Sequence, residues 1–301
     1  MSSWDRAFHA YGPARGGDEL LDVLQRGGED TYLKDHPGAV WQPYTFLWTA
    51  LHCGGRITPA TVLGLRHLVS AVTADDFGGS DPTLRVAAVW WIRDVIRSAL
   101  TGNDLDSARL IAARRNDPAV HEWLDEFLRQ ERSIFDWDAG DAPGQVLIAA
   151  ARVDCFDFLP ECFAPLSTLL APSQPEELRA AAASATALLV AHPSLRRYHD
   201  EITAYHAEQA CQGSPRYRES MVLGLGELGV TPTKWLSDAE LGVRVSAALA
   251  PGLVGDETAA EVLRLAYLHP AALDGLSLHQ LPSINQAVAE ALGERSAEWG
   301  P

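Results

Sequence analysis

The sequence carries few basic residues for its length. Among 301 residues, 24 lysines and arginines stand against 40 aspartates and glutamates, which gives a formal charge of −16. A nucleic-acid-binding surface needs basic side chains that displace counterions from phosphates, so this balance argues against a nucleic-acid partner. The same charge suits a basic protein or a cationic small molecule, and it also favours solubility by itself. A hydrophobic content of 47% is ample for a folded core.

Signals for export and for membrane insertion are also missing. The opening residues, MSSWDRAFHAYG, contain no basic stretch followed by an apolar one, and long apolar runs such as Ala180–Ala191 are alanine-rich and interrupted by Ser and Thr. We therefore expect a cytoplasmic protein with no membrane association. The four cysteines form no C-x-x-C pair and are expected to be reduced and mostly buried: Cys53, Cys155, Cys162 and Cys211.

No motif for metal or nucleophilic chemistry is present. The sequence contains neither H-E-x-x-H nor G-x-S-x-G. Residues 224–229 match G-x-G-x-x-G, but a dinucleotide site needs a strand before the motif; here the glycines close an apolar helix, where they favour close packing and a left-handed stop. His199 and His206 lie too far apart along one helix to share a metal. Cys53, beside His52, is the one thiol outside apolar surroundings. We expect no metal and no cofactor, and the balance leans against an enzyme.

Alternation of apolar and polar residues is almost absent, which predicts an all-α chain with essentially no strand. The segment 135–144, FDWDAGDAPG, is rich in Gly, Pro and Asp. It is the predicted boundary between an aromatic-rich N-terminal half, 1–134, and C-terminal repeats, 145–301, within one continuous array. The expected helices include those near 4–9, 40–51, 144–153, 158–170, 194–211, 256–268 and 281–293.

A short pattern recurs along the chain and is clearest within 214–249. A turn with Pro or Asp starts a helix, an Arg follows inside the helix, and small and apolar residues come next. The arginines that mark the pattern are Arg85, Arg179, Arg218 and Arg244, at intervals of 94, 39 and 26 residues. The middle interval fits a two-helix repeat of about 40–47 residues. The pattern predicts a HEAT-like α-solenoid of antiparallel helix pairs, wound into a right-handed superhelix, with degenerate repeats.

Three motifs spread over most of the chain carry a resemblance. They are Trp4 followed by HAYG at 9–12, the link HCGGRITPAT at 52–61, and YRESMVLGLGELG at 217–229. With them the chain resembles a group of bacterial HEAT-repeat proteins, whose patterns read W-x-x-x-x-HAYG, HQGTVYPAT and VRxSLxLALGxLG. In the link, Cys53, Arg56 and Thr58 replace Gln, Thr and Tyr, so a pocket formed there would differ in this chain. The resemblance implies a fold and little about function, because HEAT proteins serve as scaffolds, inhibitors, immunity factors and occasionally enzymes.

Aromatic residues concentrate in the first third of the chain. Adjacent tryptophans on a helix point about 100° apart, so Trp90 and Trp91 are not expected to face the same core seam, and one of them is a candidate to line a groove. Two interpretations stay open: an aromatic cap that seals the end of the solenoid, or a pocket with aromatic walls and a few polar groups. The candidate binding residues are Tyr11, Trp48, Trp90, Trp91 and Arg93.

Two hypotheses for function follow. The leading one is a protein that binds another protein, of immunity or regulatory type, through the concave face of the solenoid, and the acidic charge suits a basic partner. The alternative is a small-molecule-binding protein or an enzyme of specialised metabolism. In that alternative His9 or His52 is the general base and Asp94 is an orienting carboxylate.

Overall fold

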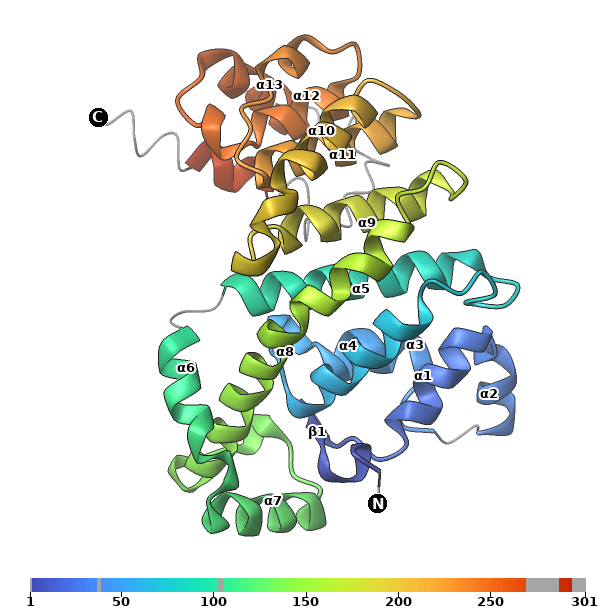
Figure 1. Ribbon diagram of the computed structural model, residues 1–301, viewed down its shortest axis with the longest axis vertical. Coiled ribbons are helices and arrows are strands. Elements are labelled where there is room, and N and C mark those ends of the chain that lie inside the picture. Colours follow the sequence, from blue (N-terminus) through green and yellow to red (C-terminus); the bar gives the residue numbers. More distant parts are fainter. Residues whose placement is uncertain (1, 37–38, 102–104, 269–286, 294–301) are drawn as a thin grey trace. The chain divides into compact units, whose positions relative to one another are not determined.

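The computed structural model describes residues 2–36, 39–101, 105–268 and 287–293 (Figure 1). Within these ranges the regular secondary structure is helical apart from two strands of two residues each, which confirms the all-α prediction. The helix expected near 256–268 is α13 (Glu257–Leu268). Of the last expected helix, residues 287–293 are helical, and its earlier part lies outside the described residues.

Contacts within the chain divide it into two units, Met1–Thr168 (unit 1) and Leu169–Pro301 (unit 2). The segment 135–144, predicted as the boundary, instead lies inside unit 1. The physical reason is that this segment is fastened there by buried polar contacts: Asp141 is 2% exposed and accepts hydrogen bonds from Trp123 and Arg132 of the same unit. Gly140 of this segment lies in a 3-10 turn, and Pro143 and Gly144 lie in the first turn of the helix that begins at Ala142, so the segment is not a linker.

Helix α8 lies at the centre of unit 1, where it packs against α4, α5, α6 and α7. The sequence predicted two helices here, but α8 is one helix that continues through Pro160 and Pro165. Its buried residues Cys155, Leu159 and Cys162 recur at helical spacing across the predicted gap, so burial of one continuous face outweighs the missing donors. The helices of unit 1 are α1 (Gly17–Arg26), α2 (Glu29–Asp35), α3 (Pro43–Thr45), α4 (Pro59–Ala71), α5 (Pro82–Thr101), α6 (Leu105–Ala112), α7 (Pro118–Gln130) and α8 (Ala142–Thr168).

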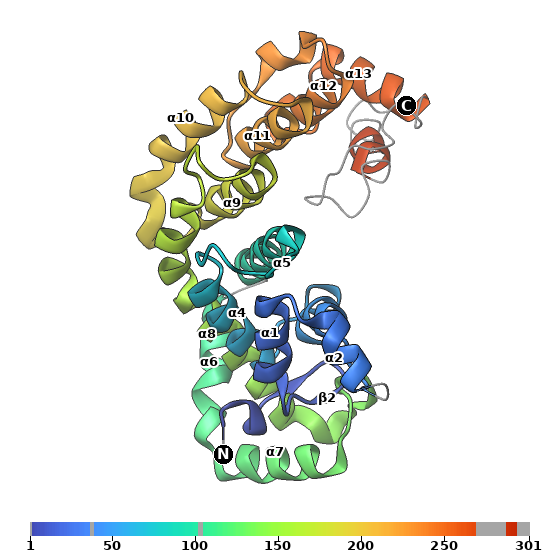
Figure 2. The ribbon, with the colours of Figure 1, turned by 90° about the vertical axis from the view of Figure 1, so that its right-hand side faces the viewer.

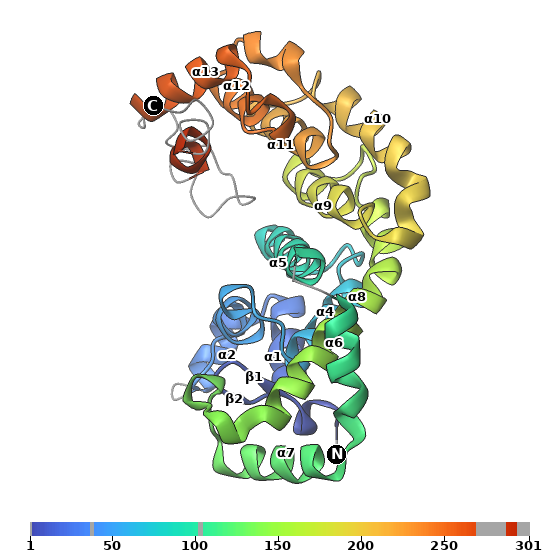
Figure 3. The same cartoon turned by 90° about the vertical axis from the view of Figure 1, so that its left-hand side faces the viewer.

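The first residues form a β-hairpin where a helix over 4–9 was expected. Strand β1 (Phe8–His9) pairs antiparallel with β2 (Gly12–Pro13), after a 3-10 turn at Trp4–Arg6. Figures 2 and 3 show the hairpin between α1 and α7. Ala10, at the hairpin turn, donates its N–H to a backbone carbonyl at position 50 and accepts an N–H from position 134. Distant backbone partners thus hold this segment extended, and local sequence does not reveal them.

A π-helix, Phe46–Leu51, follows α3 where a regular helix over 40–51 was expected. Its wider turn shifts the buried face to Phe46, Leu47, Ala50 and Leu51, whereas Tyr44 of the predicted apolar stripe is 43% exposed. Trp41 of that stripe precedes α3 altogether. Short π-helical segments are frequent at functional sites.

Helix α1 ends in direct backbone contact with the loop that precedes α5. Gly27 and Gly79 have φ of 66° and 58°, and a Cβ atom on either would collide with the backbone of the other segment. The N–H of Gly78 donates to the carbonyl of Gln25 at 2.6 Å. Only glycine permits both the left-handed conformation and this approach.

Unit 2 is a succession of helices, each packed against its neighbours in the chain. Helix α9 contacts α10 and α11, α11 contacts α10 and α12, and α12 contacts α13 (Figure 3). The helix expected over 194–211 is a 3-10 turn, Pro193–Tyr198, that runs into α10. The helices of unit 2 are α9 (Glu176–Leu189), α10 (His199–Gln209), α11 (Pro215–Glu227), α12 (Leu241–Ala248) and α13.

The glycines of the G-x-G-x-x-G match pack and end a helix, as predicted. Gly224 lies in α11 against the ring of His206, and Gly226 lies against Ala250. Gly229, with φ of 76°, follows the end of the helix. The residues before the motif are helical and not a strand, so the match does not indicate a dinucleotide site.

The arginines that marked the predicted repeats share one structural position. Each is the fourth residue of its helix: Arg85 in α5, Arg179 in α9, Arg218 in α11 and Arg244 in α12. Two of them repeat one contact. The Nε of Arg85 donates to the carbonyl at the end of α4 (2.8 Å), and that of Arg218 to the carbonyl at the end of α10 (3.2 Å). Carbonyls at helix ends lack intrahelical partners, so a cation there stabilises the turn.

Candidate functional site

Four segments bring three aromatic side chains and an arginine together on unit 1. Tyr11 of the hairpin is 42% exposed, and Phe135, in a 3-10 turn, is 52% exposed. The Tyr11 ring centroid lies 5.4 Å from that of Phe135 and 5.5 Å from that of Trp41. The exposed guanidinium of Arg56 lies over the Phe135 ring, 5.4 Å from its centroid. We call Tyr11, Trp41, Arg56 and Phe135 the aromatic patch.

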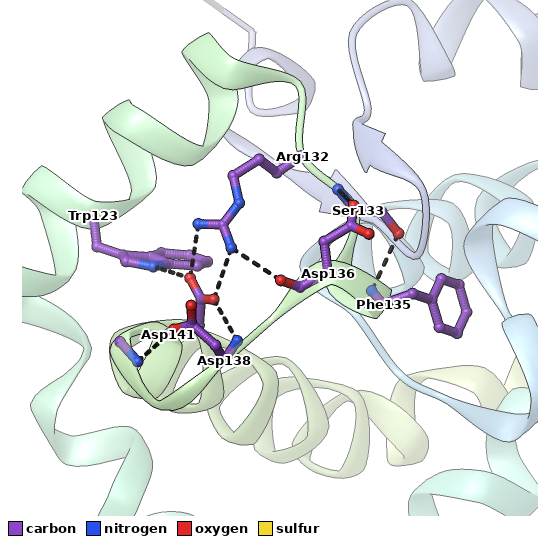
Figure 4. Close-up of polar contacts among 8 residues, drawn as sticks. Trp123, Arg132, Ser133, Phe135, Asp136, Asp138 and Asp141 are labelled. Carbon is purple, nitrogen blue, oxygen red and sulfur yellow. Dashed lines mark hydrogen bonds and ion pairs between the residues drawn. The ribbon is translucent and has the colours of Figure 1, made fainter.

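A buried carboxylate sets the turn that presents Phe135 (Figure 4). Asp141 accepts hydrogen bonds from the indole N–H of Trp123 (2.9 Å) and from both terminal nitrogens of Arg132 (3.0 and 2.8 Å). Burial opposes ionisation of Asp141, but the bonds from Arg132, a backbone N–H and Trp123 outweigh burial, so the pKa of Asp141 lies below its usual range. Arg132 also donates to the carbonyl of Asp136 (3.2 Å), which joins the network to the turn.

The same turn is tied to the hairpin. The hydroxyl of Ser133 and the N–H of Ile134 both donate to the carbonyl of Ala10, at 2.9 and 3.1 Å. The N–H of Phe135 donates in turn to the Ser133 hydroxyl (3.1 Å). Tyr11 and Phe135 are therefore held next to each other by backbone contacts, and their proximity does not depend on their own rings.

His9 lies beneath the patch. It is 3% exposed, and its ring meets those of Trp41 and Phe46 edge to face, at 5.4 and 5.6 Å. Its Nδ1 accepts the N–H of Tyr11 (3.1 Å). Burial lowers the pKa of His9 to about 4, so its imidazole is neutral at physiological pH. The predicted general base is thus a buried hydrogen-bond acceptor that supports Tyr11.

Tyr11 also faces the link segment. Its hydroxyl lies 3.7 Å from the sulfur of the half-buried Cys53, and hydrogen bonding to Cys53 raises the pKa of Tyr11.

The prediction that the cysteines are mostly buried holds for two of the other three. Cys155 and Cys162 are buried, and burial raises the pKa of both thiols, so they are unreactive, whereas Cys211 is exposed.

The candidate residues of α5 lie in the core. Trp90 and Trp91 are 5% and 0% exposed and Arg93 is 1% exposed, so the expectation that one tryptophan lines a groove is wrong. The physical reason is that α5 is apolar on nearly all sides and packs against α1, α4 and α8, which covers both tryptophans at once. Trp48 is half-buried beside Tyr44, with ring centroids 6.4 Å apart.

His52 and Asp94, by contrast, belong to one polar cluster. The Nε2 of His52 lies 2.9 Å from the hydroxyl oxygen of Ser98, and its ring meets Trp91 edge to face at 6.3 Å. Burial lowers the pKa of His52, and the charge of Asp94 opposes that shift. Asp94 accepts a hydrogen bond from Arg93 at 3.0 Å.

Sequence reasoning missed four residues of these two sites: Trp41, Arg56, Ser98 and Phe135. Ser98 follows Asp94 by one helical turn, and that spacing is a signal that the sequence does contain. Arg56 and Phe135 carried no such signal, because the contact between them is long-range. It connects the link at 52–61 with the segment 135–144, which was predicted from the sequence to be a boundary.

Groupings that would suggest other classes of site do not occur in the described part of the chain. There, no three His, Cys, Asp or Glu side chains gather closely enough to hold a metal ion. None of the helices in the same ranges combines the length and apolar character that crossing a bilayer requires. Comparison of the chain with protein-family models, with curated proteins and with solved structures gives no match.

Proposed function

We propose that this chain is a HEAT-like interaction protein that binds another protein through the aromatic patch. The single observation that carries the proposal is the patch itself: exposed Tyr, Phe and Arg side chains with a half-buried Trp, brought together from four segments and supported from beneath by His9. Trp, Tyr and Arg are the residues that most often dominate the energy of protein interfaces. A fixed aromatic surface also loses little conformational entropy when it binds.

The HEAT-like arrangement is supported by the repeated arginines. Arg85 and Arg218 occupy the same helical position and make the same contact with the end of the preceding helix. A shared contact at a shared position is what a duplicated helix pair retains after its other residues diverge.

The partner that fits is a basic protein. The chain carries a net charge of −16, and the exposed carboxylates of Glu131 and Asp136 lie in the segment that presents Phe135. Opposite charge on a partner would speed association and select against acidic competitors. We propose a regulatory or immunity-type role, in which this chain covers a basic surface of its partner. Among roles for a binding protein, this one requires both the aromatic patch and the negative charge.

The test compares recovery of a partner by matched variants. We expect the native chain to retain a stoichiometric basic protein from the lysate of its own cells, and the double variant Tyr11→Ser, Phe135→Ser to lose it. The control is Leu110→Ser on α6, which removes an apolar side chain that is 75% exposed and outside the patch. Equal recovery by the double variant, or no stoichiometric protein in any sample, contradicts the proposal.

A further inference from the structure

His52, Ser98 and Asp94 form a polar cluster whose residue types are those of a nucleophilic site, and the proposed protein binding does not require them. His52 follows the π-helix, and its ring reaches across to Ser98 on α5, where the Nε2–Oγ distance is 2.9 Å. The two side chains stand 46 residues apart in the sequence. A serine hydroxyl bonded to a neutral imidazole is the pair that activates an oxygen nucleophile.

The protonation state of His52 suits this role. Burial lowers its pKa, so the ring is neutral at physiological pH and can accept a proton on Nε2. Asp94 lies one helical turn before Ser98, and its negative charge favours the imidazolium that forms when His52 takes up a proton. Asp94 thus acts on His52 through its charge.

Gly55 of the link lies next to the half-buried Ser98. Gly54 and Gly55 are exposed and have φ of 56° and 80°. A Cβ atom on Gly55 would lie 3.6 Å from the Ser98 oxygen, in ordinary contact, and one on Gly54 would meet no atom within 4 Å. The link therefore places one exposed residue without a side chain beside Ser98, and this is the side from which a small carbonyl compound would approach.

Other histidines of the chain show what a purely structural contact looks like. Both ring nitrogens of His206 face backbone carbonyls, at 3.1 and 3.2 Å, and the ring is fully buried. His192 contacts the Ser194 hydroxyl at 2.9 Å, but that serine is only two residues away, and His192 itself caps the 3-10 turn by accepting the N–H of Ser194. His52 differs from both, because its ring contacts the hydroxyl of a serine that is 46 residues away and lies on another helix.

We propose that Ser98, activated by His52, is a nucleophile toward small carboxylic esters. The Ser98 oxygen attacks the ester carbonyl carbon while its proton moves to Nε2 of His52. The bond from that carbon to the alcohol oxygen then breaks, and the alcohol leaves with the proton from His52. Water, deprotonated by His52, attacks the acyl-serine, the carboxylic acid leaves, and the proton returns to Ser98. No oxidant, metal or other co-reactant is needed.

The experiment treats the full chain with diisopropyl fluorophosphate and, separately, with p-nitrophenyl acetate. We expect one phosphoryl adduct, located on Ser98 by peptide mass analysis, and a burst of p-nitrophenol stoichiometric with the protein. Ser98→Ala abolishes both, and His52→Gln slows both by about 100-fold. The matched control is Ser194→Ala, which removes a serine hydroxyl that also lies against a histidine ring and leaves both signals unchanged.

A second variant guards against loss of fold. Ser98→Cys replaces the oxygen with sulfur, and the new thiol is expected to react with iodoacetamide faster than the exposed Cys211, in a protein whose circular dichroism is unchanged. An unlabelled Ser98 in the native chain overturns the proposal, as does an undiminished rate in folded His52→Gln. Neither outcome involves a partner protein, so this test and the recovery experiment fail independently.

Discussion

The two units use their side chains in different ways. All 8 phenylalanines of the chain lie in unit 1, which also contains the hairpin and the π-helix. Unit 2 is built from short helices with small cores; α9 buries alanines at positions 180–183, 185 and 187. Among the described residues of unit 2, large exposed hydrophobic side chains occur only at the end of α13. Unit 1 presents Tyr11 and Phe135 in the aromatic patch and others on α6 and near α3. Both candidate sites therefore lie in unit 1 and include residues from its irregular segments: the hairpin, the link and the turn at Phe135.

This contrast has an energetic side. Unit 1 holds its exposed residues in place with a buried ionic network, and unit 2 depends on close approach of helices through glycine and alanine. Substitutions that remove a charge should therefore be most damaging in unit 1, and substitutions that add atoms should be most damaging in unit 2.

The largest effect is expected for Asp141→Ala in unit 1. The change leaves the half-buried Arg132 and the indole N–H of Trp123 without their acceptor, and loss of these charge-assisted hydrogen bonds together costs about 4 kcal/mol of unfolding free energy. Urea denaturation measures it. Asp125→Ala is the control, because its ion pair with Arg6 is exposed on both sides and should contribute little. Equal losses in the two variants would contradict the network's role.

Acid should weaken unit 1 through His9. Its pKa is about 4 in the folded chain and near 6.5 when unfolded, so the unfolded state binds a proton first as the pH falls. Stability is unaffected above about pH 6.5, declines down to about pH 4, and is then lower by about 3 kcal/mol. Denaturation across this range is compared with that of His9→Gln. The variant should show a shallower decline and not a flat one, because burial also lowers the pKa of His206, which remains.

Gly224→Ala tests the packing of unit 2. Its new methyl group would enter the ring of His206, which cannot retreat because backbone carbonyls face both of its nitrogens. We expect a loss of about 2 kcal/mol, measured by thermal denaturation. Gly255→Ala serves as control, since a Cβ atom there meets nothing within 4 Å. If the two variants melt alike, close approach at α11 does not limit the stability of unit 2.

The smallest effect on stability is expected at the surface of the patch. Arg56→Ala removes a cation from the face of an exposed ring, which is worth about 0.5 kcal/mol. Partner recovery should nevertheless fall, and Arg26→Ala, another exposed arginine of unit 1, should leave recovery unchanged. A large loss of stability in Arg56→Ala would indicate that the patch stabilises the fold of unit 1. The proposed contrast between a binding surface on unit 1 and a purely structural unit 2 would then be wrong.

Local patterns predicted much of unit 2 and less of unit 1. Spacing alone placed the repeated arginines and the glycines that end α11, because both depend on residues within a few turns of each other. The hairpin depends on bonds from Ala10 to positions 50 and 134, which no local pattern encodes. The patch likewise joins Tyr11 to Phe135, and the burial of Trp90 and Trp91 depends on three other helices around α5.

The glycine contact between α1 and the loop before α5 has a consequence for measurement. Alanine scanning removes side-chain atoms, and Gly27, Gly78 and Gly79 have none to remove, so such a scan would pass over this contact. Amide hydrogen exchange would detect it. The N–H of Gly78 is held by the carbonyl of Gln25, and its exchange requires two distant parts of the backbone to separate. That proton should therefore be among the last in unit 1 to exchange, although it lies in a loop.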